Sequence, residues 1–270
     1  MIGVFDSGFG GLTIFKDIEA KLPNYNYIYL GDNARAPYGN NSQEVIYEYT
    51  RQAVDYLFAQ NCKLIILACN TASAEALRKL QQEYVPQKYP GKNILGVIRP
   101  LAEEAVGITK NKVIGVMGTR STIESKSYVK ELQRLTKEIQ VIQQACPLLV
   151  PLVEENWESH PETKMILKKY IVPLKDNRPD TIILACTHYG WLQSDIVRYF
   201  GKDIKVLDSG EIVARKLVDY LQRHPEYVRP AKKRGKRIFL TTDNHKKFAL
   251  AAQKYLGRKI IAKTISLNIK

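Results

Sequence analysis

The chain has 270 residues, of which 45% are hydrophobic and 25% are charged. This composition is typical of a globular protein and excludes collagen, coiled coil and extensive disorder. The formal net charge is +14, but the excess is concentrated in one segment. Residues 227–270 hold thirteen Lys and Arg and one acidic residue, Asp243, whereas the rest of the chain holds 28 basic and 26 acidic residues. This division excludes a uniformly basic nucleic-acid-binding protein.

Hydropathy and cysteine content indicate the compartment. No apolar run approaches the roughly 18 residues that a membrane-spanning helix needs, and the chain does not begin with the regions of a signal peptide. The four cysteines follow no disulfide-framework spacing, which is typical of a reducing compartment. We therefore expect a cytoplasmic protein without membrane insertion.

Two kinds of apolar pattern alternate along the chain. Short runs rich in Ile, Val and Leu predict strands over residues 2–5, 27–30, 64–68, 94–98, 113–117, 140–143, 181–185, 205–207 and 237–240. Apolar residues at three- and four-residue intervals predict helices over residues 43–60, 73–84, 122–137, 190–200 and 211–223. Apolar strands separated by helices predict an α/β protein with parallel sheets covered on both faces.

Several strand ends repeat one another. The segment LIILACNT at residues 64–71 reappears as TIILACTH at residues 181–188, and VFDSG at residues 4–8 has a counterpart in VMGT at residues 116–119. These repeats indicate two similar halves related by a pseudo-twofold axis, with a break near residues 97–100. Ligands bind beyond the carboxyl ends of parallel strands. We therefore expect Cys69 and Cys186 on opposite walls of a crevice between the halves.

The two matched cysteines suit acid–base chemistry. A thiol between a strand end and a helix start faces the helix amides, which predicts a lowered pKa. The alternative is that both are small buried apolar side chains, the interpretation we prefer for Cys62 and Cys146. A zinc site would need closer ligand spacing, and a Cys–His hydrolase would need one thiol. Only proton transfer to both faces of a carbon atom uses a symmetric pair.

Three further features belong to the candidate site. The turn DSGFGG at residues 6–11 matches no dinucleotide or P-loop motif; it is either an anion-binding turn that includes Ser7 or a tight turn capped by Asp6. The polar loop at residues 31–39 has the character of a lid or binding loop. His188 is the histidine beside a candidate catalytic group, whereas His160, His224 and His245 are expected to be ordinary surface or core residues.

These motifs resemble the glutamate racemase family, within the wider group of aspartate/glutamate racemases. The resemblance rests on VFDSGFGGL at residues 4–12, PYG at 37–39, ACNTAS at 68–73, CPLLVPLVE at 146–154 and ACTHY at 185–189. It implies a cofactor-independent interconversion of L-glutamate and D-glutamate for bacterial peptidoglycan; a related aspartate or other amino-acid racemase is the alternative. It also implies two flavodoxin-like domains, residues 1–97 plus 208–270 and residues 98–207, and a homodimer.

The resemblance also implies roles for individual residues. Cys69 and Cys186 would be the two acid/base groups, with Cys186 deprotonating the L-enantiomer. Asp6 and His188 would lie behind the thiols and near the substrate, with Glu154 at the second wall. The remaining substrate-binding residues would be Ser7, Tyr38, Gly39, Asn70, Thr71, Thr119 and Thr187. No metal site is expected.

Some features depart from that pattern or lie outside it. Gly190-Trp191, Arg99 and Asp243-Asn244 replace residues that the family commonly has, and we expect changes at the pocket rim or the domain hinge. The basic cluster consists of Arg229, Lys232, Lys233, Arg234, Lys236 and Arg237. It is either a solvated loop or, as a second kind of function, a surface for weak binding of nucleic acid or another polyanion.

Overall fold

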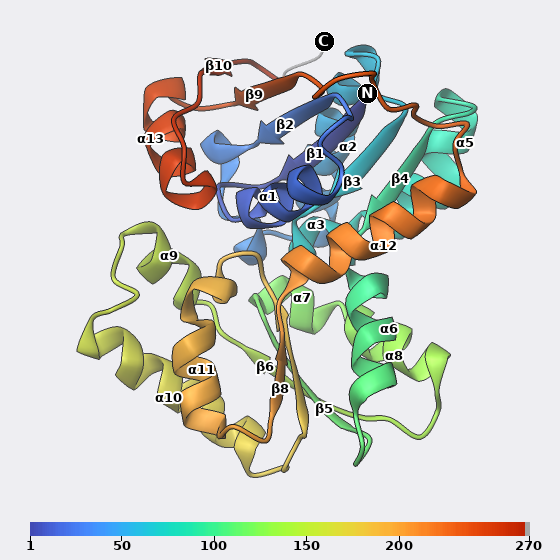
Figure 1. The fold of residues 1–270 in the computed structure, drawn as a ribbon. Helices are drawn as coiled ribbons and strands as arrows, with labels where there is room; N and C mark the ends of the chain where they lie inside the picture. The colour runs from blue at the N-terminus through green and yellow to red at the C-terminus, as the bar shows by residue number, and fades with distance from the viewer. Residues whose placement is uncertain (268–270) are drawn as a thin grey trace.

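The computed structural model of the protein describes residues 1–267 and contains two parallel β-sheets, one above the other in Figure 1. The first sheet has the strand order β10-β9-β2-β1-β3-β4, and the second has the order β6-β5-β7-β8. The strands of the first sheet are β1 (Ile2–Asp6), β2 (Tyr27–Gly31), β3 (Leu64–Leu67), β4 (Asn93–Gly96), β9 (Arg237–Thr241) and β10 (Ala262–Thr264). Those of the second are β5 (Val113–Gly118), β6 (Gln140–Ala145), β7 (Thr181–Ala185) and β8 (Lys205–Leu207).

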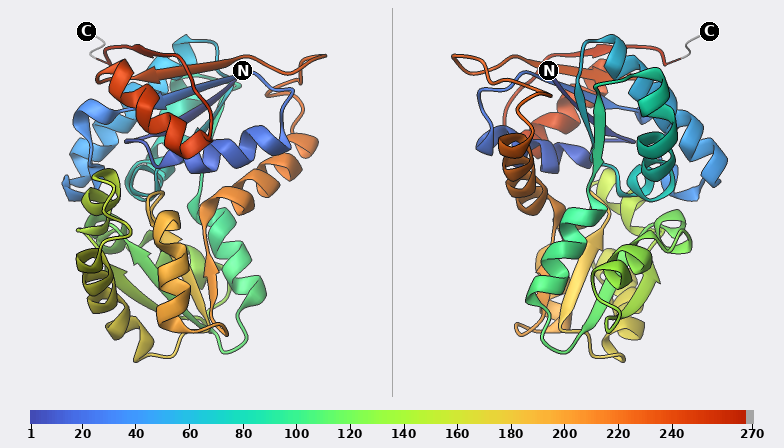
Figure 2. Two further views of the ribbon diagram at one scale, coloured as in Figure 1. Left: turned by 60° about the vertical axis from the view of Figure 1, so that its left-hand side comes forward. Right: turned by 90° about the vertical axis from the view of Figure 1, so that its right-hand side faces the viewer.

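Helices cover both faces of each sheet, as the two views in Figure 2 show. On the first sheet, one face packs against α1 (Gly11–Lys21), α12 (Ser209–Arg223) and α13 (His245–Leu256). The other face packs against α2 (Gln43–Ala59), α3 (Asn70–Glu75), α4 (Leu77–Lys79), the π-helical η3 (Leu80–Tyr84) and α5 (Val85–Lys88). Successive side chains of a strand point to opposite faces of the sheet. Val4 of β1 therefore packs in the hydrophobic core on the α1 face, and Phe5 packs in the core on the α2 face.

The second sheet is enclosed in the same way. One face packs against α9 (Leu149–Glu154), α10 (Pro161–Lys175), η4 (Tyr189–Leu192) and α11 (Gln193–Phe200). The other packs against α6 (Ile98–Ile108), α7 (Arg120–Glu124) and α8 (Ser127–Leu135). Two short turns, η1 (Asn33–Arg35) and η2 (Tyr38–Asn40), follow β2. Within residues 1–267, no helix combines the length and apolar character needed to cross a membrane.

The sheet topology confirms the α/β fold class and carries the internal repeat. The strands β2-β1-β3-β4 of one sheet and β6-β5-β7-β8 of the other follow the same order, which is the start of the flavodoxin-like order. The two cysteine motifs follow the equivalent strands β3 and β7. We propose to divide the chain accordingly into a first domain of residues 1–97 and 208–270, whose last three residues lie outside the described part, and a second domain of residues 98–207.

The structure corrects the sequence prediction at several elements, including the predicted helix at residues 73–84, which is divided among α3, α4 and η3. The predicted strand at residues 94–98 ends at Gly96, and Ile98 begins α6; Pro100 lies in the first turn of that helix, where no donor is needed. The predicted helix at residues 122–137 is split by Lys126, whose left-handed φ of 56° separates α7 from α8. The edge strand β10 was not predicted because Ala262, Lys263 and Thr264 contain no branched apolar run.

Candidate active site

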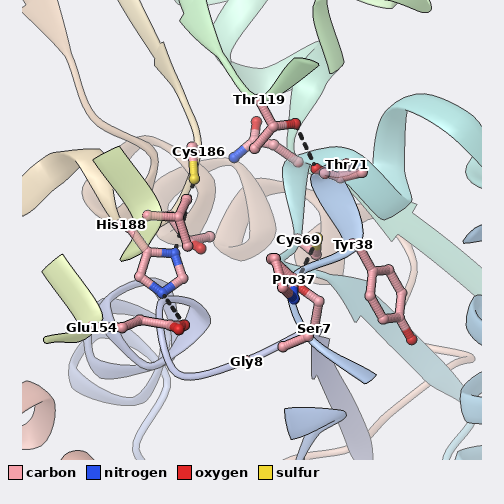
Figure 3. A pocket seen from close by; sticks show the side chains of 15 residues that line it. Ser7, Gly8, Pro37, Tyr38, Cys69, Thr71, Thr119, Glu154, Cys186 and His188 are labelled. Atoms are coloured by element: carbon pink, nitrogen blue, oxygen red, sulfur yellow. Dashed lines mark hydrogen bonds and ion pairs between the residues drawn. The ribbon is translucent and has the colours of Figure 1, made fainter. Parts of the chain in front are cut away.

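Both matched cysteines line one pocket at the carboxyl ends of the strands, where the two domains meet (Figure 3). Cys69 follows β3 and caps the N-terminus of α3, and Cys186 follows β7. Their side chains come from opposite walls and are almost fully buried. The pocket is lined by Ser7, Gly8, Ala36, Pro37, Tyr38, Gly39, Cys69, Asn70, Thr71, Thr119, Val150, Glu154, Cys186, Thr187 and His188.

The thiol of Cys69 is held by a helix start and a hydroxyl. The Ala72 amide donates to its Sγ at 3.4 Å, and the thiol donates to Ser7 Oγ at 3.4 Å. Burial nevertheless raises the pKa of Cys69 to about 11, with a further increase from the Asp6 carboxyl, and the hydrogen bonds only partly offset this. The expectation of a lowered pKa is therefore wrong for the ligand-free site, because loss of water costs the thiolate more than the helix amides return.

The thiol of Cys186 faces a histidine–carboxylate pair. His188 Nδ1 lies 3.9 Å from Cys186 Sγ, and His188 Nε2 lies 3.0 Å from Glu154 Oε1. His188 is buried, whereas the Glu154 side chain is about a quarter exposed, at 27%. Burial raises the pKa of Cys186 well above its ordinary value, so this thiol is also protonated in the ligand-free site. The two thiols thus occupy matched positions but have different neighbours: Ser7 contacts Cys69, and the His188–Glu154 pair faces Cys186.

The glycine-rich turn after β1 is a tight turn that Asp6 stabilises. The fully buried Asp6 accepts a hydrogen bond from the Gly8 amide at 2.9 Å, and burial raises the pKa of its carboxyl. Helix α1 begins at Gly11 with Gly10 at the N-cap position, and the Asp6 carboxyl also interacts with the backbone of Gly11. A Cβ at Gly10 would lie 2.8 Å from His188 Nδ1, so only glycine lets the second domain approach this turn so closely.

A group of threonines joins the two domains above the pocket. Thr71 Oγ1 of the first domain lies 2.9 Å from Thr119 Oγ1 and 3.3 Å from Thr122 Oγ1 of the second. Thr119 caps α7 by accepting from the Thr122 amide. A Cβ at Gly39 would lie 2.6 Å from the Thr119 Cβ, so this approach also requires glycine.

Tyr38 lines the pocket with its ring, but its hydroxyl points away from the thiols (Figure 3). That hydroxyl donates to the fully buried Asp32 at 2.5 Å. Asp32 also accepts hydrogen bonds from the Arg35 guanidinium and from Thr242 Oγ1, both at 2.7 Å. The loop that carries Tyr38 and Gly39 is therefore fixed through one carboxylate to Thr242, the residue after β9.

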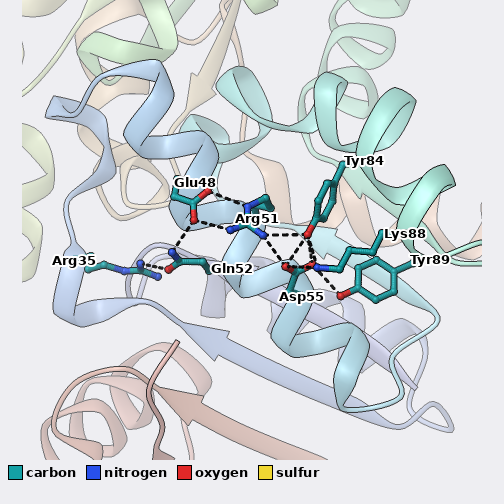
Figure 4. Close-up of polar contacts among 8 residues, drawn as sticks. All are labelled: Arg35, Glu48, Arg51, Gln52, Asp55, Tyr84, Lys88 and Tyr89. Carbon is teal, nitrogen blue, oxygen red and sulfur yellow. Dashed lines mark hydrogen bonds and ion pairs between the residues drawn. The ribbon is translucent and has the colours of Figure 1, made fainter. Parts of the chain in front are cut away.

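Arg35 continues this network onto helix α2 (Figure 4). Its guanidinium donates to Gln52, which in turn donates to Glu48. Arg51 then joins Glu48 to Asp55. Asp55 accepts hydrogen bonds from Tyr84, at the end of the π-helical segment, and from Lys88 and Tyr89, at the end of α5. The pocket loop is in this way braced against a polar cluster on the outer face of the first domain.

Comparisons with known proteins agree with this geometry. Residues 2–217 match the family model for Asp/Glu/Hydantoin racemases. The chain belongs to the Asp/Glu/Hydantoin racemase family. It is 38% identical over 260 residues to a glutamate racemase of Geobacter metallireducens, covering 96% of this chain and 93% of that protein.

Solved structures of the racemase family share the whole fold. A glutamate racemase isoform from Bacillus anthracis is 36% identical, with a TM-score of 0.92 over 100% of this chain and 98% of that one. The glutamate racemase of Francisella tularensis in complex with D-glutamate is 30% identical, with a TM-score of 0.89 over 99% of this chain and 97% of that one.

The structure gathers the candidate residues of this racemase family member around one pocket. Every residue expected at the site lines the pocket except Asp6, which lies beneath it and supports the turn of Ser7 and Gly8. Their individual roles stay predictions. Sequence reasoning missed Asp32 and Thr122, although Asp32 lies in the polar loop and directly follows a buried strand, which was an available signal.

Trp191 and Arg99, two of the residues that depart from the common family sequence, form contacts outside the pocket lining. The Trp191 ring stacks edge-on against Tyr255 of α13 at 5.1 Å, and Lys254 Nζ lies 4.7 Å above the indole. Lys254 also binds Glu158 of the second domain at 2.7 Å. Arg99 is exposed on α6, outside the pocket lining, where it pairs with Glu103 and Glu131. Trp191 and Lys254 therefore take part in a packed interdomain contact.

The pocket has chemical groups for proton transfer and little free space. Within residues 1–267, no group of three or more His, Cys, Asp or Glu side chains is placed to hold a metal ion. The cavity offers about 20 Å³ to the centre of a water molecule, roughly what a single water needs. An amino acid is larger than the space that this arrangement leaves.

Proposed function

We propose that this chain interconverts L-glutamate and D-glutamate by moving the α-proton between the substrate and two opposed thiols. The observation that carries the proposal is the burial of Cys69 and Cys186 on opposite walls of one pocket, at equivalent strand ends of two repeated domains. Membership of the racemase family and 38% identity to a glutamate racemase over almost the whole chain support glutamate as the substrate. The D-glutamate supplies bacterial peptidoglycan synthesis.

The reaction needs one thiolate and one thiol at a time. The thiolate takes the α-proton, so that the Cα–H bond breaks, an S–H bond forms, and the electron pair passes to the substrate carboxylate. The opposite thiol then gives its proton to the other face of the α-carbon and becomes the thiolate. The product is the opposite enantiomer, and no oxidant or reductant is consumed. The proposed reaction therefore uses no cofactor.

The substrate itself helps to create the thiolate. Both thiols hold raised pKa values in the ligand-free pocket, chiefly because of burial. The ammonium group of an amino acid brings a positive charge between them, which favours the ionised form of a nearby thiol. Closure over the substrate would strengthen this attraction by excluding water.

The unequal walls assign different helpers to the two thiols. We assign Cys186 to the L-enantiomer, with His188 held by Glu154 to orient or exchange its proton. Cys69 serves the D-enantiomer, with Ser7 at its sulfur and Asp6 beneath the turn. The negative charge that develops on the substrate carboxylate needs donors aimed at it beforehand. Asn70, Thr71, Thr119 and Thr187 line the pocket and supply them, with Ser7, Tyr38, Gly39 and the neighbouring backbone around the rest of the substrate.

The deciding experiment is racemisation in heavy water. Purified, chelator-treated protein incubated with L-glutamate should yield D-glutamate that carries deuterium at the α-carbon, because the proton returned to carbon comes from a thiol that exchanges with solvent. A requirement for a dialysable cofactor would contradict the cofactor-free mechanism. Faster turnover of aspartate than of glutamate would instead assign the chain to aspartate.

Two finer proposals concern the setting of the enzyme. The four cysteines are free and buried, which suits the reducing cytoplasm. A homodimer stays a prediction from the family resemblance. Sedimentation at high micromolar concentration tests it, and a single monomeric species would contradict it.

A further inference from the structure

The amide of Asn70 is held from the opposite domain. Asn70 is the first residue of α3 in the first domain, next to Cys69, and its side chain is 2% exposed. Its Oδ1 accepts a hydrogen bond of 2.6 Å from the hydroxyl of Tyr128 in α8 of the second domain. Tyr128 is fully buried. Tyr128 belongs to none of the motifs that resemble the racemase family, and it does not line the pocket.

The other end of the amide has no protein partner. Asn70 Nδ2 is buried, and within residues 1–267 it makes no hydrogen bond, although Asn70 lines the pocket. A buried donor without a partner costs free energy and is uncommon in native proteins. A substrate carboxylate in the pocket would supply the missing acceptor. The unpaired donor is therefore best explained as a binding group.

The direction of the Tyr128 bond fixes which end of the amide faces the pocket. Burial raises the pKa of the Tyr128 hydroxyl well above its ordinary value, so the hydroxyl keeps its proton and needs an acceptor. Asn70 Oδ1 is that acceptor. With Oδ1 engaged, the NH2 group is turned away from Tyr128. A flipped amide would present an oxygen to the substrate carboxylate and repel it.

Two helices of the second domain, α7 and α8, are tied to α3. Ser127 Oγ donates to the Ala74 carbonyl at 2.8 Å, and Ser121 Oγ donates to Glu75 Oε1 at 2.7 Å. These bonds join second-domain helices to the far end of the same short helix. The position of Tyr128 relative to Asn70 is therefore set by the packing of one domain on the other.

We propose that Tyr128 is a positioning residue that orients the Asn70 amide so that Nδ2 donates to a substrate carboxylate, and that this alignment exists only while the two domains are packed together. The proposal rests on the proposed racemase function and deepens it. Carboxylate binding by the first domain is coupled to the placement of the second. When the domains part to admit substrate, the amide is released from Tyr128, and it regains its orientation as they close.

The test is a double-mutant cycle of Tyr128→Phe and Asn70→Ala. Tyr128→Phe keeps the buried ring and should raise KM for both enantiomers about fivefold to tenfold, the size of one hydrogen bond, with a smaller change in kcat. Asn70→Ala should raise KM at least as much. Because Tyr128 acts through Asn70, adding Tyr128→Phe to Asn70→Ala should change KM by less than twofold. Effects that multiply in the double variant would overturn the proposal.

Tyr27→Phe is the matched control. Tyr27 is also fully buried and donates one hydrogen bond, to the Leu22 carbonyl at 2.8 Å, but it lies in the core of the first domain, outside the pocket lining. This variant should lose similar thermal stability and keep the wild-type KM. An equal rise in KM in both single-tyrosine variants would make the Tyr128 effect merely structural and overturn the proposal.

The two proposals can fail separately. Wild-type protein that neither binds nor racemises glutamate would overturn the proposed function and this inference with it. If the wild-type protein racemises glutamate but Tyr128→Phe and Asn70→Ala change KM independently of each other, only the role of Tyr128 is overturned. If Tyr128→Phe does not fold, Asn70→Asp keeps an acceptor for Tyr128 but replaces the donor with a negatively charged oxygen. Calorimetry should then show loss of glutamate binding in a folded protein, and unchanged binding would overturn the proposal.

Discussion

At the scale of single residues, the two thiols should be separable by substitution. Cys69→Ala and Cys186→Ala should each lower racemisation about 10²- to 10⁴-fold, because each face of the α-carbon loses its only acid/base group. Each single variant should still eliminate a good leaving group from one enantiomer of a substrate analogue, since elimination needs one base. Cys62→Ala and Cys146→Ala, which change buried cysteines outside the pocket, are the matched controls. Near wild-type racemisation by Cys69→Ala would disprove the two-base mechanism.

His188 should act in one direction more than in the other. It lies beside Cys186 and is bonded to Glu154, so His188→Asn should lower kcat for L-glutamate more than kcat for D-glutamate. The comparison uses kcat because the equilibrium constant of a racemisation is one, which makes kcat/KM equal in both directions. Equal losses of kcat would show that His188 is a structural or general binding residue.

The raised thiol pKa values predict an alkaline rise in activity. Burial raises the pKa of Cys69 to about 11 and that of Cys186 well above its ordinary value. At neutral pH the free enzyme therefore holds both thiols protonated, and kcat/KM should rise with pH, approaching tenfold per unit. Steady-state rates between about pH 6.5 and 9.5 measure this, with stability checked at each pH. A plateau that is already complete at pH 6.5 would contradict it.

The sequence predicts which residues line the pocket better than it predicts their pKa values. Cys69 and Cys186 are recognisable because they follow matched strands. The direction of their pKa shift is not recognisable, because helix amides are visible in a local motif whereas burial depends on how two domains close. Tyr128 was missed because it acts on a pocket residue through a contact that only the folded chain creates, whereas the position of Asp32 after a buried strand was a signal in the sequence.

At the scale of elements, Glu19 anchors the C-terminal segment to helix α1. Its carboxylate is only 6% exposed and binds Arg234 at 2.6 Å, Arg237 at 3.2 Å and Arg258 at 2.5 Å. Burial alone would raise the pKa of Glu19, but the hydrogen bonds from Arg258 and Arg234 outweigh it and lower the pKa. One α1 side chain thus fixes both the start of β9 and Arg258, two residues after α13.

Removing the charge of Glu19 should loosen that anchor. Glu19→Gln leaves three guanidinium groups around a neutral amide and should lower the free energy of unfolding by about 1–3 kcal/mol, since two of the arginines remain partly hydrated. Because the folded pKa is lowered, the wild-type advantage is complete above the ordinary pKa of glutamate and is lost as pH falls through the folded value. Chemical denaturation at pH 7 and at low pH measures both effects.

Glu211→Gln is the control for this anchor. Glu211 pairs with Lys21 of the same helix α1 at 3.2 Å, but it is 60% exposed. This substitution should cost about 0–1 kcal/mol, as is usual for surface ion pairs. An equal loss in the two variants would contradict the anchoring role of Glu19.

Strand and helix predictions succeed where a local apolar pattern decides the structure. The strand pattern of residues 181–185 agrees with β7 because it is buried on both faces. Helix α6 was missed because Arg99-Pro100 looks like a break, although a proline is tolerated in a first helical turn. The edge strand β10 takes its structure from pairing with β9, a contact that its own three residues do not encode.

At the scale of the whole molecule, the basic cluster is divided by the fold. Arg234 and Arg237 are bound to Glu19, so two of the six predicted cations already have a carboxylate partner. Arg229, Lys232, Lys233 and Lys236 are exposed, and none forms an ion pair within the described part of the chain. Arg237 also lines a groove together with Arg258 and Lys259. The cluster that remains free is smaller than the sequence predicts.

The topology also separates this cluster from the pocket. Arg237 pairs in register with Tyr27 at the amino end of β2. The residues before Arg237 therefore lie at the side of the first sheet where the parallel strands begin. Cys69 and Cys186 follow the carboxyl ends of β3 and β7, on the side where the strands end. Figure 2 shows the segment before β9 projecting at the end of the molecule away from the second domain. Binding of a polyanion there should therefore leave the catalytic pocket undisturbed.

Charge reversal of Lys232, Lys233 and Lys236 to Glu tests whether this surface binds polyanions. It avoids Arg234, whose loss would also weaken the Glu19 anchor. If the segment is an attachment surface, the variant should lose retention on DNA or heparin at low salt, because the contact is mainly electrostatic, and it should keep the wild-type racemisation rate. Reversal of Lys168, Lys169 and Lys202, exposed on the second domain, changes net charge equally and should retain binding. Equal losses in both variants would show a general effect of net charge, and wild-type protein that is not retained even at low salt would show that the segment is a solvated loop.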